Sequence, residues 1–514
     1  MPPYGTVTKI TVMDLLTVPA VADQIARIRA AQPAWEQLAV RRRLTPVRAL
    51  RRLVADECDA LCEPAQRELG KTPEETIAGD LLPLADACLF LEREADSLLR
   101  PRRVPAAQRP LSLWGQSDRV YRRPRGVVGV IGTWNYPLLL NGVQIVQALA
   151  AGNGVLWKPS EVAPGCAESL YGLFRKAGFP DGLLQRMDSS REAGQALVEA
   201  AVDHVVFTGS AAVGRRIAAR LGERLVSCTL ELSGCDAMFV LHDADVNLAA
   251  AAAWFGATLN RGQTCIAVRR AFVQRSVYPA FCDRLKELAS AAVPVKLALP
   301  SQARLAERLV AEALADGGRL VASPSPPNPL PQGERGERNG DPACFTPTVV
   351  VDARPNLALC REPSFAPILA VIPFDALDDA LDWNGRCPYG LGASIFTRDG
   401  GKAESLAALL PAGMVAVNDV VAPTTHPATP FLGVGDSGWG ATQGAEGLLE
   451  MTTAQVVSRR GGTFRPHYDL AAGKDTAKQS DLLRGLLESG HASTVGRRWR
   501  GWRRLLAALW RGAS

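Results

Sequence analysis

Between Val127 and about Asp243, strand-like segments alternate with helix-like segments. The β-branched run Val127 to Gly132 is followed by Asn141 to Ala151, whose apolar residues have helical spacing, and the alternation continues beyond it. Parallel strands must be joined by long crossover connections, and these are usually helices. The alternation therefore predicts an α/β fold in which helices cover both faces of a parallel sheet.

A second α/β stretch runs from about Ser233 to Asp419. It contains short strand-like runs at Ile368 to Ile372, Ala393 to Thr397 and Met414 to Asn418. The chain has 514 residues, which is too many for one compact core. We therefore expect two or more domains, two of them α/β.

The composition excludes several classes of protein. A hydrophobic fraction of 47% and a charged fraction of 21% are ordinary for a soluble globular protein, and no apolar run approaches the ~20 residues of a membrane-spanning helix. The N-terminus lacks the pattern of a secretory signal, so a cytoplasmic location is expected. The eleven cysteines and five histidines are scattered, which predicts reduced thiols and no metal site.

The charge is also informative. The formal net charge is +6, and residues 497–511 hold six arginines and no acid. The rest of the chain is therefore close to neutral. A nucleic-acid-binding protein would carry a basic face on its folded domain, so no nucleic-acid partner is expected.

Two residues suggest a nucleophile with a separate base. Cys265 ends the segment Gly262-Gln263-Thr264-Cys265, and Glu231 ends an apolar strand-like run earlier in the chain. Thiolate attack followed by base-assisted hydrolysis needs such a pair. A single cysteine is more often a small buried hydrophobe, so the pair alone is a weak indication.

Two strand ends have the features of a dinucleotide site. Phe207 to Gly214 is typical of strand, glycine turn and helix, so Gly209 and Ser210 would lie where a helix N-terminus stabilises a pyrophosphate. Lys158 and Glu161 follow another strand-like run and could hydrogen-bond ribose hydroxyls. The alternatives are an ordinary βα turn and a solvated Lys/Glu pair. The absence of a P-loop disfavours a phosphate-hydrolysing enzyme.

Asn135 follows Thr133 and Trp134 at the end of the first strand-like run. Its side-chain amide could donate to a developing oxyanion, with the backbone N–H of Cys265 as the second donor. The alternative is a turn asparagine before Tyr136-Pro137, which is common.

Together these segments resemble the aldehyde dehydrogenase superfamily. The matching segments occur in that family's order and spacing from about residue 20 to residue 460, which is nearly the whole catalytic body. They are TWNYP, WKPSE, FTGSAAVG, ELSG, GQTC, PYGLGASIF, Val417-Asn418 and PFLGVGDSG. Most are weak individually, but their order identifies the chain as a member of the family.

The resemblance implies NAD-dependent oxidation of a small-molecule aldehyde to its acid. Cys265 would attack the aldehyde, Asn135 and the Cys265 amide would hold the oxyanion, and Glu231 would activate the water that hydrolyses the thioester. The implied cofactor site comprises Thr133, Trp134, Lys158, Ser160, Glu161, Gly209, Ser210, Gly214 and Phe365. The Glu161 carboxylate would repel a 2′-phosphate, which favours NAD over NADP, although Lys158 would partly offset that repulsion.

The resemblance also implies a domain organisation. Residues 1–231 would form a Rossmann-like cofactor domain with an oligomerisation arm around 107–124, and residues 232–430 would form the catalytic domain. Residues 431–460 would return to the cofactor domain and supply an oligomerisation strand, and residues 461–514 would be a basic amphipathic extension. The family usually pairs subunits through such strands, so a homodimer or a homotetramer is expected.

Three segments depart from the family's pattern. In E-L-G-G-K-x-P the lysine is replaced by Cys235, and the glutamate of E-x-F-G-P is absent from Pro363 to Pro367 unless Glu362 substitutes. The lysine of P-F-G-G-x-K-x-S-G is missing from Pro430 to Gly438. These departures predict weaker dinucleotide binding than the family norm. Calorimetric titration with NAD tests this, and a micromolar affinity would count against it.

Two other functions are alternatives. A catalytically silent homologue, serving as a structural or membrane-recruited partner, fits the departures but not the intact Cys265, Glu231 and Asn135. A CoA-acylating relative would not need the base Glu231. The sequence does not specify the aldehyde.

Two segments have the composition of additions. Residues 322–341 are rich in proline, glycine and charge, which predicts a disordered surface loop. In residues 497–511, arginines oppose an apolar helical face. That face comprises Trp499, Trp502, Leu505, Leu506, Leu509 and Trp510. Such a helix can make a peripheral contact with an anionic membrane, and the alternatives are docking on this protein or a partner subunit, or a disordered tail.

Overall fold

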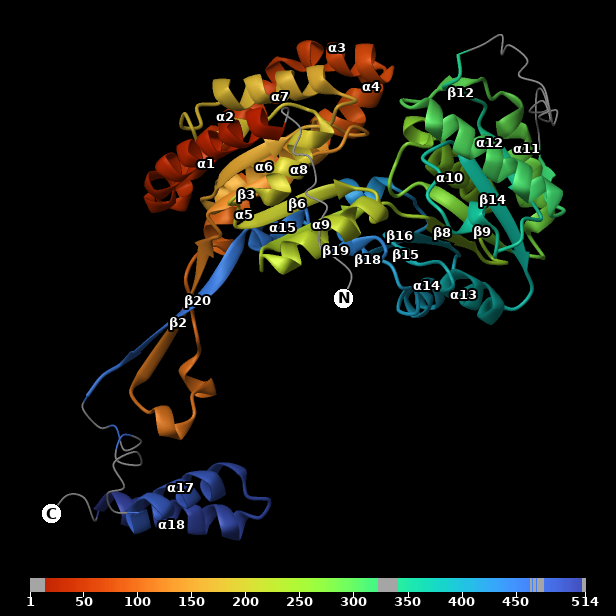
Figure 1. The fold of residues 1–514 in the computed structure, drawn as a ribbon. Coiled ribbons are helices and arrows are strands. Elements are labelled where there is room, and N and C mark those ends of the chain that lie inside the picture. The colour runs from red at the N-terminus through yellow and green to blue at the C-terminus, as the bar shows by residue number, and fades with distance from the viewer. Residues whose placement is uncertain (1–13, 322–340, 463–464, 466–467, 469–475, 511–514) are drawn as a thin grey trace, which may run out of the picture. The chain divides into compact units, whose positions relative to one another are not determined.

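The computed structural model describes residues 14–321, 341–462, 465, 468 and 476–510 (Figure 1). The chain divides into two compact units. The first comprises Met1–Leu99 and Arg123–Thr453, and the second comprises Arg100–Arg122 and Ala454–Ser514. The loop expected at 322–341 falls almost wholly outside the described residues.

The first unit contains a six-stranded sheet with the strand order β19-β7-β6-β3-β4-β5. Five strands are parallel, and the short β19 runs antiparallel to β7. The strands are β3 (Val127–Ile131), β4 (Gly154–Lys158), β5 (Leu184–Arg186), β6 (His204–Gly209), β7 (Ser227–Leu232) and β19 (Gly438–Trp439). The predicted parallel sheet is confirmed.

Helices cover both faces of this sheet (Figure 1). Successive side chains of a strand point to opposite faces, so Val128 and Val130 enter one core, whereas Val127 and Ile131 enter the other. The first core is completed by α2 (Val40–Asp56), α3 (Cys58–Leu69), α5 (Leu82–Leu98), α6 (Leu139–Ala151), α7 (Pro164–Lys176) and α15 (Gly444–Glu450). The second is completed by α1 (Asp14–Gln37), α8 (Arg191–Glu199) and α9 (Ala211–Glu223).

A second sheet of seven strands has the order β11-β13-β14-β9-β8-β16-β17, and all but β11 are parallel. The strands are β8 (Asp236–Val240), β9 (Val268–Gln274), β11 (Arg319–Leu320), β13 (Thr348–Val351), β14 (Ile368–Phe374), β16 (Gly392–Phe396) and β17 (Met414–Val417). One face packs against α12 (Pro300–Ala315), α13 (Leu377–Gly385) and α14 (Gly400–Ala407). The other packs against α10 (Val246–Thr258) and α11 (Tyr278–Ser290). The predicted second α/β fold is therefore confirmed.

Short elements join these parts. They are α4 (Pro73–Thr76), the π-helical turn η1 (Ile77–Leu81), the 3₁₀ turns η4 (Leu259–Gly262), η5 (Ala358–Cys360) and η6 (Ala422–Thr425), and the strands β10 (Val295–Lys296), β12 (Cys344–Phe345), β15 (Tyr389–Gly390) and β18 (Val434–Gly435). Single π-helical turns are frequent at functional sites, and η1 carries the buried Asp80.

The second unit contains a small sheet and a helical pair. The sheet has the order β1-β2-β20, with β1 (Arg102–Arg103), β2 (Gln116–Pro124) and β20 (Thr452–Arg460). The 3₁₀ turns η2 (Ala106–Gln108) and η3 (Leu111–Leu113) lie between β1 and β2. The helical pair is α17 (Thr476–His491) and α18 (Val495–Trp510), which pack against each other.

This helical pair corrects the predicted apolar face of the C-terminal segment. Leu505 is buried against α17, whereas Trp499 and Trp502 are exposed. The prediction treated the segment as a lone helix, and packing against α17 divides its apolar residues between two faces. Among the described residues, no helix is both long and apolar enough to cross a membrane.

Candidate active site

The predicted site residues of the first sheet lie at the carboxyl ends of neighbouring strands. Glu231 of β7 pairs with Thr208 of β6, Lys158 ends β4 opposite Ile131 of β3, and residues 133–135 follow β3. The chain passes from β3 to β4 and β5 on one side, and then to β6 and β7 on the other. Ligands of open parallel sheets bind outside the carboxyl ends at such a reversal of strand order.

A constrained loop carries Cys265. Asn260, Arg261 and Gly262 have positive φ angles of 49°, 57° and 69°. A Cβ at Gly262 would lie 2.3 Å from the carbonyl carbon of Ala366, so only glycine fits there. Consecutive residues in this conformation persist only where their surroundings hold them, and such segments cluster at active sites.

Hydrogen bonds tie this loop to the segment after β3. Asn260 Nδ2 donates to Asn135 O at 3.0 Å, and Asn135 Nδ2 donates to Gln263 O at 3.1 Å. Thr133 Oγ1 donates to Asn135 Oδ1 at 3.0 Å, which fixes the orientation of the amide. The amide group carries two hydrogens, so the bond to Gln263 leaves one for a further acceptor. The structure thus brings Asn135 to the loop of Cys265.

Glu231 and Cys265 are buried and interact electrostatically. Burial raises the pKa of Glu231 from 4.5 to about 7, while the Cys265 thiol and the Thr208 hydroxyl oppose part of that rise. Burial and the Glu231 carboxylate raise the pKa of the Cys265 thiol well above its ordinary value. Neither carboxylate oxygen of Glu231 accepts a well-aligned hydrogen bond from the described residues. Glu231 is therefore a buried acceptor that titrates near neutral pH, as a general base requires.

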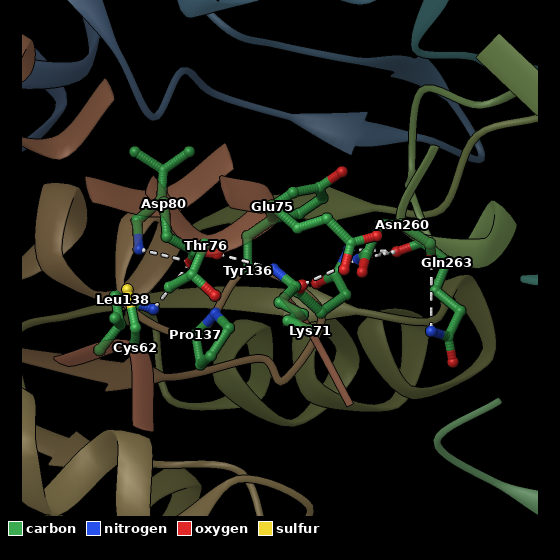
Figure 2. Close-up of polar contacts among 12 residues, drawn as sticks. Cys62, Lys71, Glu75, Thr76, Asp80, Tyr136, Pro137, Leu138, Asn260 and Gln263 are labelled. Carbon is green, nitrogen blue, oxygen red and sulfur yellow. Dashed lines mark hydrogen bonds and ion pairs between the residues drawn. The ribbon is translucent and has the colours of Figure 1, made fainter. Parts of the chain in front are cut away.

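A buried polar network connects the turn η1 with the loop that carries Cys265 (Figure 2). Lys71 Nζ donates to Asp80 Oδ2 at 2.7 Å and lies 4.3 Å from the centre of the Tyr136 ring. The Tyr136 hydroxyl is 2.8 Å from Thr264 Oγ1, next to Cys265 in the chain. The network thus links the turn η1 to the residue that precedes the candidate nucleophile.

Asp80 also fixes the start of α6. Its Oδ1 accepts hydrogen bonds from the backbone N–H groups of Leu138 and Leu139 at 3.0 and 3.1 Å. The side chains of Lys71 and Asp80 are almost completely buried. The sequence carries no signal for this pair, because isolated lysines and aspartates are usually solvated and only their burial distinguishes these two.

After β4, at the carboxyl edge of the first sheet, Glu161 lies between two cations. Its carboxylate oxygens are 3.3 Å from Lys158 Nζ and 3.1 Å from Arg191 Nε. Burial alone would raise the pKa of Glu161, but hydrogen bonds from the backbone and Arg191, with the charge of Lys158, lower it below its usual range. Nearby, Ser160 Oγ accepts from Val162 N at 3.2 Å, which shapes the turn after β4.

The turn between β6 and α9 has the geometry of an anion site. Gly209 ends β6, and Ser210 caps α9 by accepting from Val213 N at 3.4 Å. A helix N-terminus at this edge favours a phosphate group. Gly214 has a packing role, because a Cβ there would lie 2.7 Å from Leu232 Cδ2.

Cys265 also belongs to an apolar cluster. Cys265 clusters with Ile266 and Leu391, and Phe365, Val421 and Phe431 pack against this cluster. Phe365 has a φ of 48°, and its ring centroid lies 6.1 Å from that of Trp134. The structure therefore brings Phe365 and Trp134 together, with Phe365 packed against the cluster that contains Cys265.

Two departures from the family's pattern have local structural causes. Cys235 is buried, and its thiol donates to Cys360 O at 3.6 Å, so a neutral group occupies the lysine's place in the pattern. Gly435 has a φ of 60°, and a Cβ there would lie 2.5 Å from Pro388 O. A lysine would not fit that backbone.

Comparisons with known proteins show the family of the chain. The sequence profile of the Aldehyde dehydrogenase family matches residues 2–457. The chain is 34% identical to a 4,4'-diapolycopene aldehyde oxidase of Methylomonas sp, over 84% of this chain and 80% of that one. It is 30% identical to a putative succinate-semialdehyde dehydrogenase [NADP(+)] of Mycolicibacterium smegmatis, over 88% and 86%. The crystal structure of a Mycobacterium tuberculosis aldehyde dehydrogenase complexed with NAD+ superposes with a TM-score of 0.78 at 28% identity, over 87% and 92%.

The chain belongs to the aldehyde dehydrogenase family. It is an oxidoreductase whose two large sheets are predominantly parallel and covered by helices.

Proposed function

We propose that this enzyme oxidises an apolar aldehyde to its carboxylic acid, with a nicotinamide dinucleotide as acceptor and Cys265 as nucleophile. The observation that carries the proposal is the buried pair of Cys265 and Glu231, in which a base that titrates near pH 7 interacts with the thiol. Such a pair suits both steps of a thioester mechanism.

In the first step, the Cys265 sulfur attacks the aldehyde carbon and the thiol proton passes to Glu231. Because the pKa of the thiol is raised, a neighbouring proton acceptor is needed at this point. The second hydrogen of the Asn135 amide and the backbone N–H of Cys265 are the donors for the new oxyanion.

The residues at the carboxyl edge fit a dinucleotide. The N-terminus of α9 with Gly209 and Ser210 would hold the pyrophosphate, and Lys158 and Glu161 would bind the adenosine ribose. When bound, the nicotinamide supplies the hydride acceptor that the oxidation requires. Thr133, Trp134, Ser160 and Phe365 would line the same site. We assign Gly214 to packing between α9 and β7.

Before the last step, Glu231 releases its first proton to solvent. Glu231 then takes a proton from the water that attacks the thioester on Cys265, and returns it to the departing sulfur. The acid leaves and the thiol is regenerated. The buried carboxylate oxygens of Glu231 accept no well-aligned hydrogen bond from the described residues, so they are available to orient a water molecule. This base distinguishes the proposal from a CoA-acylating relative, which transfers the acyl group to a thiol instead.

The coenzyme preference follows from the charges around Glu161. The carboxylate repels a 2′-phosphate, which favours NAD, but Lys158 and Arg191 both offset its charge. We propose NAD as the preferred coenzyme and NADP as a weaker one.

The apolar surroundings of Cys265 support an apolar substrate. Five hydrophobic side chains belong to or pack against the cluster that contains Cys265, and burying an acidic aldehyde among them would cost free energy unless a cation offset the loss of hydration. The similar Methylomonas protein is named for 4,4'-diapolycopene aldehyde. The similar protein named for succinate semialdehyde makes an acidic aldehyde the second candidate.

Turnover of an aldehyde panel tests the proposal. NADH absorbance should rise with long-chain aldehydes and much less with succinate semialdehyde, with no requirement for CoA. Cys265→Ser should abolish the signal. No turnover with any aldehyde would favour a catalytically silent homologue, and strict CoA dependence would favour an acylating enzyme.

We also propose that the small sheet pairs subunits. β20 ends its sheet, and its Val456 and Val457 are exposed. An end strand with exposed valines is a template for pairing with another chain. In this account residues 1–231 and 431–460 serve the cofactor and assembly, and residues 232–430 carry the nucleophile.

A further inference from the structure

The two helices of the C-terminal hairpin, α17 and α18, meet through small residues. A Cβ on Gly501 would lie 2.3 Å from the backbone nitrogen of Ser489, and one on Gly485 would lie 2.8 Å from Leu505 Cγ. Ala508 is also buried. Glycines allow this close backbone approach, so the two helices pack without using most of their large apolar side chains.

The large apolar side chains of α18 lie on its outer surface and form a tryptophan stripe. They recur every three or four residues as Val495, Trp499, Trp502, Leu506 and Trp510. Trp499 is 67% exposed, Trp510 82% and Val495 83%. At about 100° per residue, the five side chains fall within a stripe roughly 80° wide. A continuous exposed stripe of this kind marks a binding surface, unlike scattered single apolar residues.

Arginines border the tryptophan stripe. Within its described bounds α18 holds no acid and five arginines, namely Arg497, Arg498, Arg500, Arg503 and Arg504. On a helical projection, Arg503 follows one edge of the stripe and Arg498 the other. Arg504 pairs with Glu488 of α17 at 2.8 Å, which strengthens the hairpin, whereas Arg500 and Arg503 are exposed.

We propose that the C-terminal hairpin lies on an anionic lipid surface, with the tryptophan stripe in the interfacial layer and the bordering arginines on the headgroups. Tryptophan favours that layer because its ring has an apolar body and a polar N–H. Arginine can keep its charge at the headgroups while its stem covers apolar surface. The proposal does not depend on the proposed activity.

Charge favours lipid over a second copy of the chain. Two tryptophan stripes that faced each other would bring the arginines of both helices together, and like charges oppose that contact. An anionic surface would instead neutralise them. The described helices are too short or too polar to span a bilayer, so the contact would be peripheral.

Vesicle co-sedimentation of the full-length protein tests the inference. The wild type should bind vesicles of phosphatidylcholine with phosphatidylglycerol, with a blue shift of tryptophan emission, and should bind pure phosphatidylcholine about tenfold less. A triple variant with Trp499→Ser, Trp502→Ser and Trp510→Ser should lose about tenfold or more in binding. Trp114→Ser is the matched control, because Trp114 is 73% exposed but lies outside the hairpin.

A second variant tests the charge. Arg498→Gln and Arg503→Gln together remove the two arginines that border the tryptophan stripe, leave the Arg504–Glu488 pair intact and should weaken binding to anionic vesicles only. Circular dichroism would check that helical content is kept. Equal binding by wild type and the tryptophan variant would overturn the inference. The inference would also be overturned if the wild type did not bind vesicles and sedimentation velocity showed that the tryptophan variant loses self-association. A second copy of the chain would then cover the stripe.

Discussion

At the scale of single residues, Glu231 combines two properties that oppose each other. Burial destabilises its charged form, yet catalysis as a general base needs that form. With a pKa raised by burial to about 7, both the protonated and the ionised form of Glu231 are populated near neutral pH. The folded protein should therefore lose stability when Glu231 ionises.

The first prediction concerns that loss. The folded-state pKa of Glu231 lies above its ordinary 4.5, so the folded protein retains a proton that the unfolded chain releases, and stability falls as pH rises from about 4.5 to about 7. Glu231→Gln removes this contribution. Its unfolding free energy relative to the wild type should rise by up to roughly 3 kcal/mol between pH 5 and pH 8 in denaturant titrations. A difference that stays constant across this range would contradict the assigned pKa.

The second prediction concerns Glu161. Glu161→Gln removes the carboxylate that repels a 2′-phosphate but keeps Lys158 and Arg191 in place. The ratio of kcat/KM for NAD to that for NADP should fall about tenfold, which is about 1.4 kcal/mol. Glu168→Gln, at another exposed carboxylate that pairs with an arginine, is the control. An unchanged ratio would mean that Glu161 does not contact the ribose.

At the scale of elements, the third prediction concerns the buried network that connects Lys71, Asp80 and Tyr136 with the loop that carries Cys265. Lys71→Met leaves the buried Asp80 carboxylate without its partner, which should cost about 3–5 kcal/mol in unfolding free energy. Adding Asp80→Asn removes the unpaired charge, and its amide oxygen can still accept from Leu138 and Leu139. The double variant should therefore recover most of that loss in chemical denaturation. A double variant as unstable as Lys71→Met would show that Lys71 acts through packing alone.

Periodic segments of the sequence predicted the helices and strands. Features that depend on contacts between distant segments could not be predicted in this way. The buried β-branched runs 127–132 and 368–372 indicated strands because a parallel sheet buries both faces. The positive φ angles of Asn260 and Arg261 had no signal in the sequence, since both residue types occur in many conformations. Leu505 was misplaced because a single helix does not reveal its packing partner.

At the scale of the whole molecule, the fourth prediction concerns assembly. Val456→Lys on the end strand β20 should convert the oligomer to smaller species in sedimentation velocity, because a charge on an end strand blocks strand pairing. Val293→Lys is the matched control, since Val293 is similarly exposed but lies outside this sheet. If both variants keep the wild-type sedimentation coefficient, β20 is not the pairing strand.

The whole-molecule features were the least accessible to sequence. The order of the motifs identified the family, because eight segments must all occur in the order and spacing that one fold requires. The proposed substrate class rests on the apolar cluster of Cys265, whose side chains come from segments as distant as Phe365 and Phe431. One chain also does not show its assembly, which depends on surfaces that only a second copy completes.

The account depends on an acyl group carried by the Cys265 sulfur and released by Glu231. The most direct measurement is peptide mass spectrometry of Glu231→Gln after mixing with NAD and a long-chain aldehyde. We predict a single NADH burst close to one per site and an acyl mass on the peptide that contains Cys265, which Cys265→Ser in the same background removes. Steady turnover by Glu231→Gln with no adduct on that peptide would contradict the account.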